Sequence, residues 1–180
     1  IKDSEFITVV GGNGSGKSTM LNSIAGVFSI DDGKIIIDDV EVTNMPAHKR
    51  AKYIGRVFQD PMIGSATNMS IEDNLAYANR RGKTRTLKWG ISNKERDVYK
   101  EALSQLGLNL ENRLNDRVGL LSGGQRQALT LLMATLARPN ILLLDEHTAA
   151  LDPKTAKMVM DLSEILIGKH TMTAPMATNK

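Results

Sequence analysis

The sequence has 180 residues, of which 41% are hydrophobic and 24% charged, so it is long and apolar enough to form one domain with a sizeable core. Its 23 Lys and Arg against 20 Asp and Glu give a formal charge of +3, which fits an anionic ligand but is too small to indicate nucleic acid binding. It contains no cysteine, which excludes disulfides and thiolate zinc sites. Neither a signal peptide nor an apolar run of about eighteen residues occurs, so we expect a soluble, cytoplasmic chain.

Three short apolar runs predict strands. Residues 6–10 read "FITVV" and residues 53–59 read "YIGRVFQ", and both are rich in β-branched and aromatic residues. Residues 141–145, "ILLLD", form the kind of continuous apolar run found in strands buried on both faces. Residues 31–42, "DDGKIIIDDVEV", predict a small antiparallel hairpin with Asp residues in its turns.

Helical patterns fill the intervals between these strands. Residues 18–26, "STMLNSIAG", have one apolar face and end at a glycine. Residues 92–107 begin with a Ser and a Glu at capping-box spacing, and residues 152–168 begin with Asp-Pro, a typical helix start. Strands that alternate with helices predict a mainly parallel sheet covered by helices, and the helical stretch 60–120 reads as an insertion.

The clearest functional motif is "GGNGSGKST", residues 11–19, which lies between a predicted strand and a predicted helix. Gly11, Gly16, Lys17 and Ser18 satisfy the pattern of a phosphate-binding loop. In such a loop backbone N–H groups surround the phosphates, Lys17 reaches the outer two and Ser18 ligates Mg²⁺. The alternative is a flexible Gly and Ser turn.

Three polar residues follow predicted strands. Asp145 and Glu146 end the apolar run, where one carboxylate can hold the water shell of Mg²⁺ and the other can polarise an attacking water. Gln59 ends another strand, and its amide could bridge Mg²⁺ and that water. The alternatives are a solvated strand end for the two acids and an ordinary turn for "QDP".

A second glycine motif raises a question about its ligand. Residues 119–127 read "GLLSGGQRQ", with Ser122 and Gln125 at the head of a predicted helix. A helix start of this kind suits an anion, because it presents unpaired N–H groups and the positive end of the helix dipole. The chain already has a phosphate loop, so either one motif is idle or the second serves a phosphate that this chain does not hold.

These motifs, together with "ILLLDE" and "ALDP", stand in the order and spacing of the ATP-binding cassette family, and the sequence resembles the nucleotide-binding domain of that family over nearly its whole length. The resemblance implies an α/β fold, the P-loop NTPase with a RecA-like, mainly parallel sheet, an inserted α-helical subdomain and a small antiparallel β element. It places the nucleotide-binding core in residues 1–59 and 126–180 and the helical and signature subdomain in residues 60–125. Residues 1–180 are then expected to be a single incomplete domain.

The resemblance also implies ATP and Mg²⁺ as cofactors. Two cassettes would dimerise head to tail, and each signature, "LSGGQ", would close on the γ-phosphate held by the other chain. The catalytic residues implied are Glu146, Gln59 and Lys17, and the implied metal-binding residues are Ser18, Gln59 and Asp145. The nucleotide-binding residues implied are Gly11, Asn13, Gly14, Ser15, Gly16, Lys17, Ser18, Thr19, Ser122, Gly123, Gly124, Gln125 and Asp152.

The expected function is to energise a membrane transporter, as an importer subunit for small solutes such as amino acids. This implies transmembrane permease subunits, a place on the inner face of the membrane, and an extracytoplasmic substrate-binding protein. Two alternatives remain open, a cassette with little or no turnover and a soluble cassette that does not transport. No nucleic acid partner is expected.

Three features depart from the family pattern. No Phe or Tyr can be assigned as the residue that stacks on adenine. Asn179 stands where the family has a switch histidine, and His170 is too near Glu146 to replace it. His147 stands where many cassettes have Pro, and we expect it to be a solvated neighbour of Glu146.

Overall fold

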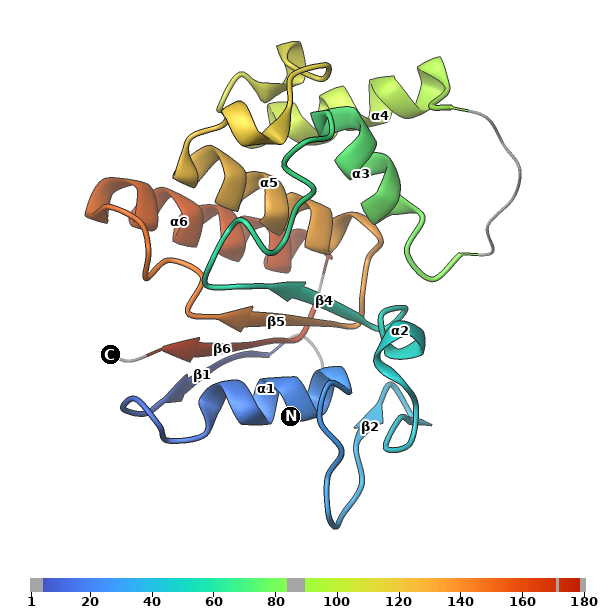
Figure 1. Ribbon diagram of the computed structural model, residues 1–180, viewed down its shortest axis with the longest axis vertical. Coiled ribbons are helices and arrows are strands. Elements are labelled where there is room, and N and C mark those ends of the chain that lie inside the picture. Colours follow the sequence, from blue (N-terminus) through green and yellow to red (C-terminus); the bar gives the residue numbers. More distant parts are fainter. Residues whose placement is uncertain (1–4, 84–89, 171, 179–180) are drawn as a thin grey trace.

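The computed structural model describes residues 5–83, 90–170 and 172–178. Its centre is a four-stranded parallel sheet made of β1 (Phe6–Val10), β4 (Ile54–Val57), β5 (Ile141–Asp145) and β6 (Ala174–Thr178), in the order β1-β6-β5-β4. All four arrowheads point the same way in Figure 1, so the carboxyl ends of the strands share one edge. Loops that follow these strands therefore meet at that edge.

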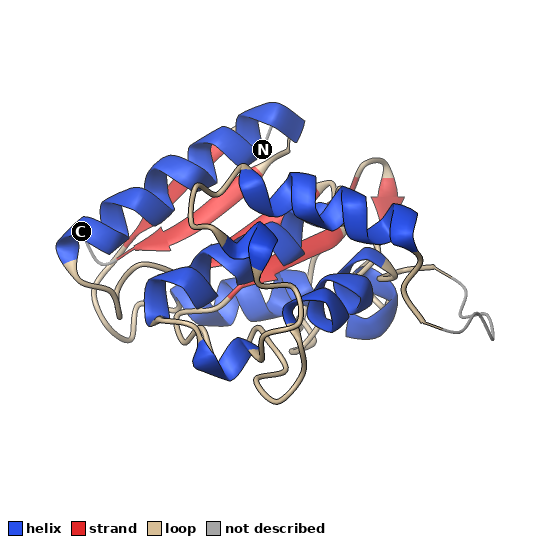
Figure 2. Cartoon of the chain, turned by 90° about the horizontal axis from the view of Figure 1, so that it is seen from above, coloured by secondary structure: helices blue, strands red, loops and turns tan. Residues whose placement is uncertain are grey.

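Helices cover both faces of the sheet. Helix α1 (Lys17–Ala25) lies on one side, and α5 (Gly123–Leu136) and α6 (Pro153–His170) lie on the other (Figure 1). Figure 2, which looks from the α6 side, shows helices lying over the strands. The fold class expected from the alternating pattern is confirmed.

Strand β5 shows why its sequence is apolar throughout. Leu143 packs in one cluster with Leu21 of α1, whereas Leu142 and Leu144 belong to the other cluster, which includes residues of α5 and α6. All three leucines are completely buried. A strand with helices on both faces must be apolar at every position, because its side chains alternate between the two layers.

The predicted hairpin is present as a two-stranded antiparallel sheet of β2 (Ile36–Ile37) and β3 (Val40–Glu41), followed by the short helix α2 (Ala47–Arg50). Asp38 and Asp39 form its turn with φ angles of 51° and 60°. Asp tolerates this left-handed region better than most residues, so the turn prediction is confirmed.

Helices α3 (Ile71–Asn79) and α4 (Asn93–Ser104) and the short 3₁₀ turns η1 (Leu110–Asn112) and η2 (Val118–Leu120) form the region above α5 in Figure 1. The predicted capping box of α4 is confirmed, because Ser92 accepts from the Glu95 N–H and the Glu95 carboxylate accepts from the Ser92 N–H. α3 has the same arrangement at its start.

Two predicted boundaries differ from the structure. The strand predicted for residues 53–59 ends at Val57, because its ladder with β5 ends at the Val57–Leu144 pair, so Gln59 lies two residues beyond the strand. Helix α6 continues to His170, two residues past the expected end near Gly168. A glycine stops a helix when it takes a left-handed conformation, and Gly168 does not.

Candidate functional site

The predicted phosphate loop connects β1 to α1 at the carboxyl edge of the sheet. Gly14 and Gly16 have φ angles of 80° and 89°, which strongly favour glycine. At Gly11 an added Cβ would lie 2.5 Å from the Ser15 Oγ and 3.1 Å from its Cβ, so a larger residue would force Ser15 to shift. Local conformation and close packing thus explain three glycines of the motif.

Lys17, the first residue of α1, lies across this loop. Its Nζ donates to the carbonyls of Gly11 at 2.6 Å and Gly12 at 3.1 Å, and it lies 3.5 Å from the Glu146 Oε1. The residue is only 8% exposed. The lysine therefore stands between the phosphate loop and the end of β5, where it can meet phosphate oxygens.

Ser18 and Asp145 meet beside this lysine. The Ser18 hydroxyl donates to the Asp145 Oδ1 at 3.1 Å, and the Asp145 Oδ2 lies 3.6 Å from Nη2 of Arg56 on β4. A hydroxyl, a carboxylate and a nearby amide are hard oxygen donors, which fits Mg²⁺ held partly by water and phosphate oxygens. Within the described residues there is no cluster of three or more His, Asp or Glu that would form an all-protein metal cage.

A cavity of about 480 Å³ lies at the phosphate loop and includes Lys17 and Ser18 in its wall, whereas Asp145 does not line it. It receives Gln59 from the turn after β4 and Glu146 from the end of β5, so two predicted catalytic residues face the phosphate loop. The residues that line it are Asn13, Gly14, Ser15, Gly16, Lys17, Ser18, Thr19, Gln59 and Glu146.

Glu146 has an unusual backbone conformation, with φ at 44°. Its N–H donates to the Ala177 carbonyl of β6 at 3.2 Å, and its own carbonyl accepts from the Ala149 N–H at 2.9 Å. Left-handed conformations of larger residues cost free energy and are often found at functional sites. The sheet thus fixes Glu146 in the geometry that places its carboxylate beside Lys17.

The signature motif lies at the start of α5. Ser122 caps the helix by accepting from the Gln125 N–H, and the Gln125 side chain accepts from the Ser122 N–H. Gly124 packs so closely on Thr155 of α6 that any larger residue would collide with it. Ser122 and Gly123 are exposed, and among the described residues the signature does not line the cavity of its own phosphate loop.

Two predicted site residues remain, Asp152 at the start of α6 and Asn179 after β6. Asp152 accepts from the Thr155 N–H at 3.1 Å and so begins α6 as predicted. Hydrogen bonds from the Thr155 side chain and from its N–H lower the pKa of the Asp152 carboxyl. Asn179 lies outside the described residues, directly after β6 ends at Thr178.

The expectation of a solvated His147 is wrong. His147 is 1% exposed, its Nε2 lies 3.0 Å from the Ser163 Oγ of α6, and burial lowers its pKa to about 4. The Ser163 hydroxyl donates to the Val159 carbonyl, so it is free to accept from the imidazole N–H. The chain turns inward after Glu146, and the imidazole fills the space beneath α6.

Two further polar residues contact the site and were not predicted from the sequence, Arg56 and Gln127. Arg56 contacts Asp145, and the signal available was a charged residue inside an otherwise apolar strand. Gln127, which is completely buried, donates from its side-chain amide to the carbonyls of Phe58 at 3.1 Å and His147 at 2.7 Å. No local pattern distinguished it from a surface glutamine of α5.

Comparison with known proteins agrees with this arrangement. The sequence model of the ABC transporter family matches residues 1–149, which is most of the chain. The chain therefore belongs to the ABC transporter family, and within it to the ATP-binding cassettes, which are ATPases.

Individual relatives are ATP-binding proteins of transport systems. The chain is 42% identical to a tyrosine transport ATP-binding protein of Clostridioides difficile over 99% of its own length and 71% of that protein. It is 36% identical to the thiamine import protein ThiQ of Chelativorans sp. over 98% of the chain and 67% of that protein. It is 35% identical to the spermidine/putrescine import protein PotA of Haemophilus influenzae over 92% of the chain, but spans only 41% of PotA.

Solved structures share the fold over the whole chain. CbiO1 of Clostridium perfringens, part of the ABC transporter complex cbiONQ, has a TM-score of 0.81 at 26% identity, with 69% of that protein covered. A dimeric ATP-binding cassette, MJ0796 bound to ADP and phosphate, has a TM-score of 0.78 at 30% identity, with 77% covered.

Proposed function

We propose that this chain binds and hydrolyses Mg-ATP as the energising subunit of a membrane importer for small solutes, and that it works as a head-to-tail dimer. The observation that carries the proposal is the cavity that brings Gln59 and Glu146 to the phosphate loop. A purely structural turn does not account for a lysine, a carboxylate and an amide around one cavity of about 480 Å³, whereas a catalytic site does.

The chemistry follows from these positions. Backbone N–H groups of the loop and the Lys17 ammonium bind the phosphates. Ser18, Asp145 and Gln59 would hold Mg²⁺, which supplies positive charge against the developing phosphate charge when it is bound. Glu146 accepts a proton from the attacking water, since its carboxylate faces the cavity beside Lys17.

A second copy of the chain would complete the site. Ser122 and Gly123 are exposed at the N-terminus of a 14-residue helix, away from the chain's own cavity. An anion-binding helix start that cannot reach its own nucleotide is well suited to the γ-phosphate of a partner. The dimeric relative bound to ADP and phosphate supports this arrangement.

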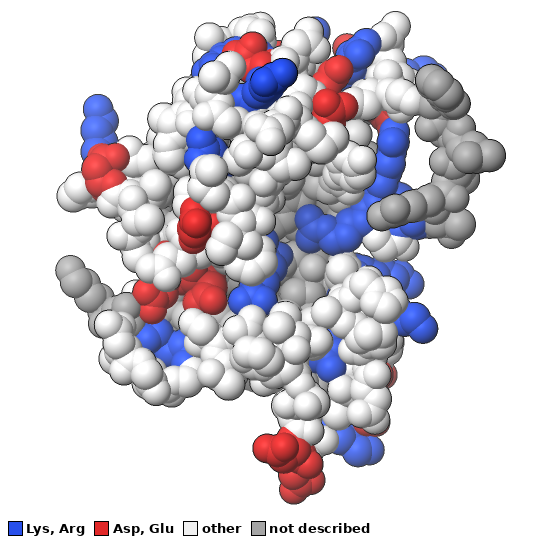
Figure 3. Space-filling view, in the orientation of Figure 1, with Lys and Arg blue, Asp and Glu red and all other residues white. Residues whose placement is uncertain are grey.

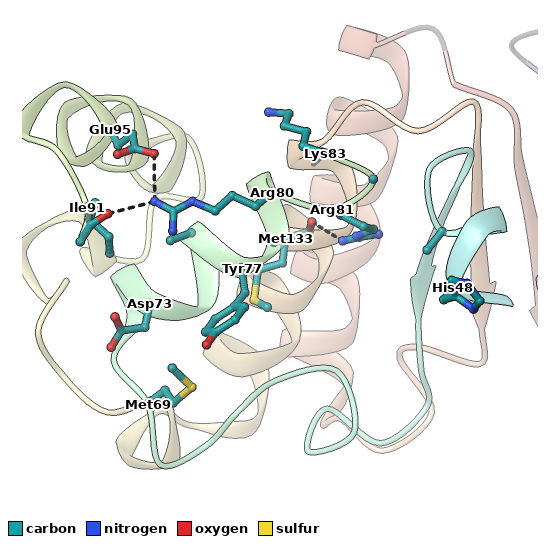
Figure 4. A pocket seen from close by; sticks show the side chains of 15 residues that line it. His48, Met69, Asp73, Tyr77, Arg80, Arg81, Lys83, Ile91, Glu95 and Met133 are labelled. Carbon is teal, nitrogen blue, oxygen red and sulfur yellow. Dashed lines mark hydrogen bonds and ion pairs between the residues drawn. The ribbon is translucent and has the colours of Figure 1, made fainter. Parts of the chain in front are cut away.

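A larger cavity of about 840 Å³ offers a place for the permease. Figure 3 shows Lys and Arg side chains beside this hollow. Figure 4 shows that its wall carries three cations, two acids of which Glu95 pairs with Arg80, and two large side chains: Arg80, Arg81, Lys83, Asp73, Glu95, Met69 and Tyr77. Arg81 donates to the Met133 carbonyl at 2.9 Å, which fixes its guanidinium in the wall. We propose that an amphipathic cytoplasmic helix of the permease, carrying acidic residues, binds here.

The cargo proposed is an amino acid, because the tyrosine transport protein is the most similar of the three relatives described above. An extracytoplasmic substrate-binding protein would deliver it. A second candidate, a cassette with little turnover, is favoured by Asn179 at the position of the switch histidine.

The test uses Glu146→Gln, which keeps the size of the side chain and removes the base. Without the base, the chain should still bind Mg-ATP but turn it over at least about a hundredfold more slowly. It should also elute as a dimer during gel filtration in Mg-ATP. Lys17→Ala is the matched control, because it should abolish both nucleotide binding and the dimer. A Glu146→Gln chain that hydrolyses ATP at the wild-type rate would remove this residue from the mechanism.

A further inference from the structure

A single buried side chain contacts both the loop that carries Gln59 and the loop that carries Glu146. Gln127 is 0% exposed, and its Nε2 donates to the Phe58 carbonyl at 3.1 Å and to the His147 carbonyl at 2.7 Å. Phe58 immediately precedes Gln59, and His147 immediately follows Glu146. One amide group therefore touches the backbone beside each of the two polar residues that face the phosphate loop.

The chemistry of this contact is specific to an amide donor. Both neighbours are carbonyls, so only the NH₂ end of the side chain can face them, and it supplies both hydrogens. The Gln127 Oε1 is buried without a hydrogen-bond partner among the described residues, so the side chain works here purely as a donor. A buried carbonyl that loses its donor is destabilised, so removal of the Gln127 amide should disturb both loops.

The bridge also joins the cavity to the signature. Gln127 lies one turn after Gly124 on α5, so both are on the same face of the helix. Gly124 packs against Thr155 at the start of α6, which follows the loop that leaves Glu146. The side chain that holds the two carbonyls is therefore carried by the same helix as the signature.

We propose that Gln127 is a positioning residue, which fixes the distance between Gln59 and Glu146 across the cavity and links that distance to the helix that carries the signature. The inference rests on the proposed ATPase function. It predicts a selective effect on turnover, because the phosphate loop that binds the nucleotide makes no contact with Gln127 in the described hydrogen bonds.

The test compares Gln127→Met, which keeps the length of the side chain and removes both donors, with Thr135→Val. Thr135 is 1% exposed on the same helix, and its hydroxyl only donates to the Leu132 carbonyl, so this control perturbs α5 away from the cavity. Gln127→Met should lower kcat by about tenfold to a hundredfold, because a shift of about 1 Å has that effect, while the Kd for a fluorescent ATP analogue changes less than about threefold. Thr135→Val should change neither value.

Hydrogen exchange provides a readout that does not depend on turnover. In Gln127→Met the peptides that contain residues 58–60 and 146–149 should exchange at least about tenfold faster, while those of the phosphate loop, residues 11–19, keep their rates. A wild-type chain that binds ATP without hydrolysing it would contradict the proposed function, and the exchange experiment would still test the bridge. The positioning role of Gln127 would be overturned if hydrogen exchange at both loops were unchanged in Gln127→Met. It would also be overturned if this variant lost ATP affinity and kcat to the same extent.

Gln127→Glu covers the case in which the methionine variant does not fold. A protonated glutamic acid can donate one hydrogen bond, whereas a carboxylate donates none and faces two carbonyl oxygens. Its kcat relative to wild type should therefore rise as the pH falls from about 8 to about 6. A ratio that is the same at every pH would contradict a role for donation.

Discussion

The Ser18 hydroxyl donates to the Asp145 carboxylate at 3.1 Å, although 127 positions separate the two residues in the sequence. The contact joins the first turn of α1 to the end of β5, and the parallel sheet makes it possible because both loops leave at the same edge. It is also the pair of oxygen donors at which we expect Mg²⁺.

Asp145→Asn should weaken the Mg²⁺ dependence of nucleotide binding. The change keeps the shape of the side chain but removes the negative charge, so Mg²⁺ half-saturation should move to at least about tenfold higher concentration while Mg²⁺-free ATP binding stays unchanged. Titration of Mg²⁺ against a fluorescent ATP analogue measures this. Asp161→Asn, at an exposed position on α6, should leave the titration unaltered. An identical curve for Asp145→Asn would exclude Asp145 as part of the metal site.

The same substitution should destabilise the fold through Arg56. The side chains of Arg56 and Asp145 are 15% and 14% exposed, so the neutral amide leaves a largely buried guanidinium without its anion. We expect a loss of about 1–3 kcal/mol in the free energy of unfolding, below the value for fully buried pairs. Arg56→Met added to Asp145→Asn should recover most of it, as measured by urea denaturation. Additive losses in the double variant would show that the pair is not coupled.

Mixing two inactive variants tests the head-to-tail dimer. Lys17→Ala destroys the phosphate loop of one chain, and Ser122→Arg blocks the signature of the other. A mixed dimer then has one site built from an intact loop and an intact signature. With random pairing and independent sites, activity should return to about a quarter of the wild-type value, because about half of the dimers are mixed and each has one intact site. A mixture no more active than its components would contradict shared, independent sites.

His147 should make the stability of the fold depend on pH. Its pKa is about 4 in the folded chain against 6.5 for an unperturbed histidine, so the unfolded chain binds the proton more readily. The contribution of neutral His147 to the free energy of unfolding is fully present above pH 6.5 and is lost as the pH falls to about 4 and below. The whole loss is about 3 kcal/mol.

His147→Gln tests this, since glutamine retains a hydrogen-bond donor for Ser163 and cannot be protonated. Urea unfolding between pH 4 and pH 7 should show a flatter dependence for this variant than for wild type. His48→Gln, at an exposed position, should follow the wild-type curve. Parallel curves for His147→Gln and wild type would mean that another group causes the acid sensitivity.

The phosphate loop and the helix caps could be predicted from local sequence, because the backbone conformation of a few neighbouring residues determines where glycines and capping residues are needed. The strand positions followed from apolar runs, since β5 must be apolar at every position between two helical layers. The sequence did not reveal the role of Gln127, whose partner Phe58 lies 69 positions away. A contact of this kind arises only when the sheet is assembled.

His147 shows the same limit more sharply. Its place directly after Glu146 suggested a solvated neighbour of that residue, yet it is buried against Ser163, 16 positions later. Glu146, the preceding residue, has a φ angle of 44°, which changes the direction of the chain before His147. A glutamate does not indicate such a left-handed conformation in the sequence. Tertiary packing, rather than local propensity, decides both positions.

The last prediction concerns Asn179, which follows β6 in the sequence and lies outside the described residues. The family resemblance puts a histidine at this position, where it would contact the γ-phosphate and orient the attacking water toward Glu146. Asn is shorter, always neutral and unable to supply an imidazolium, so hydrolysis should be slow in this chain. Asn179→His should raise kcat by about tenfold or more without a matching change in ATP affinity, because positioning of the water affects the rate steeply. The measurement is phosphate release at saturating Mg-ATP, with Asn179→Gln as the control that lengthens the side chain but adds no imidazole. If the histidine and glutamine variants turn over at the same rate, Asn179 does not occupy the switch position.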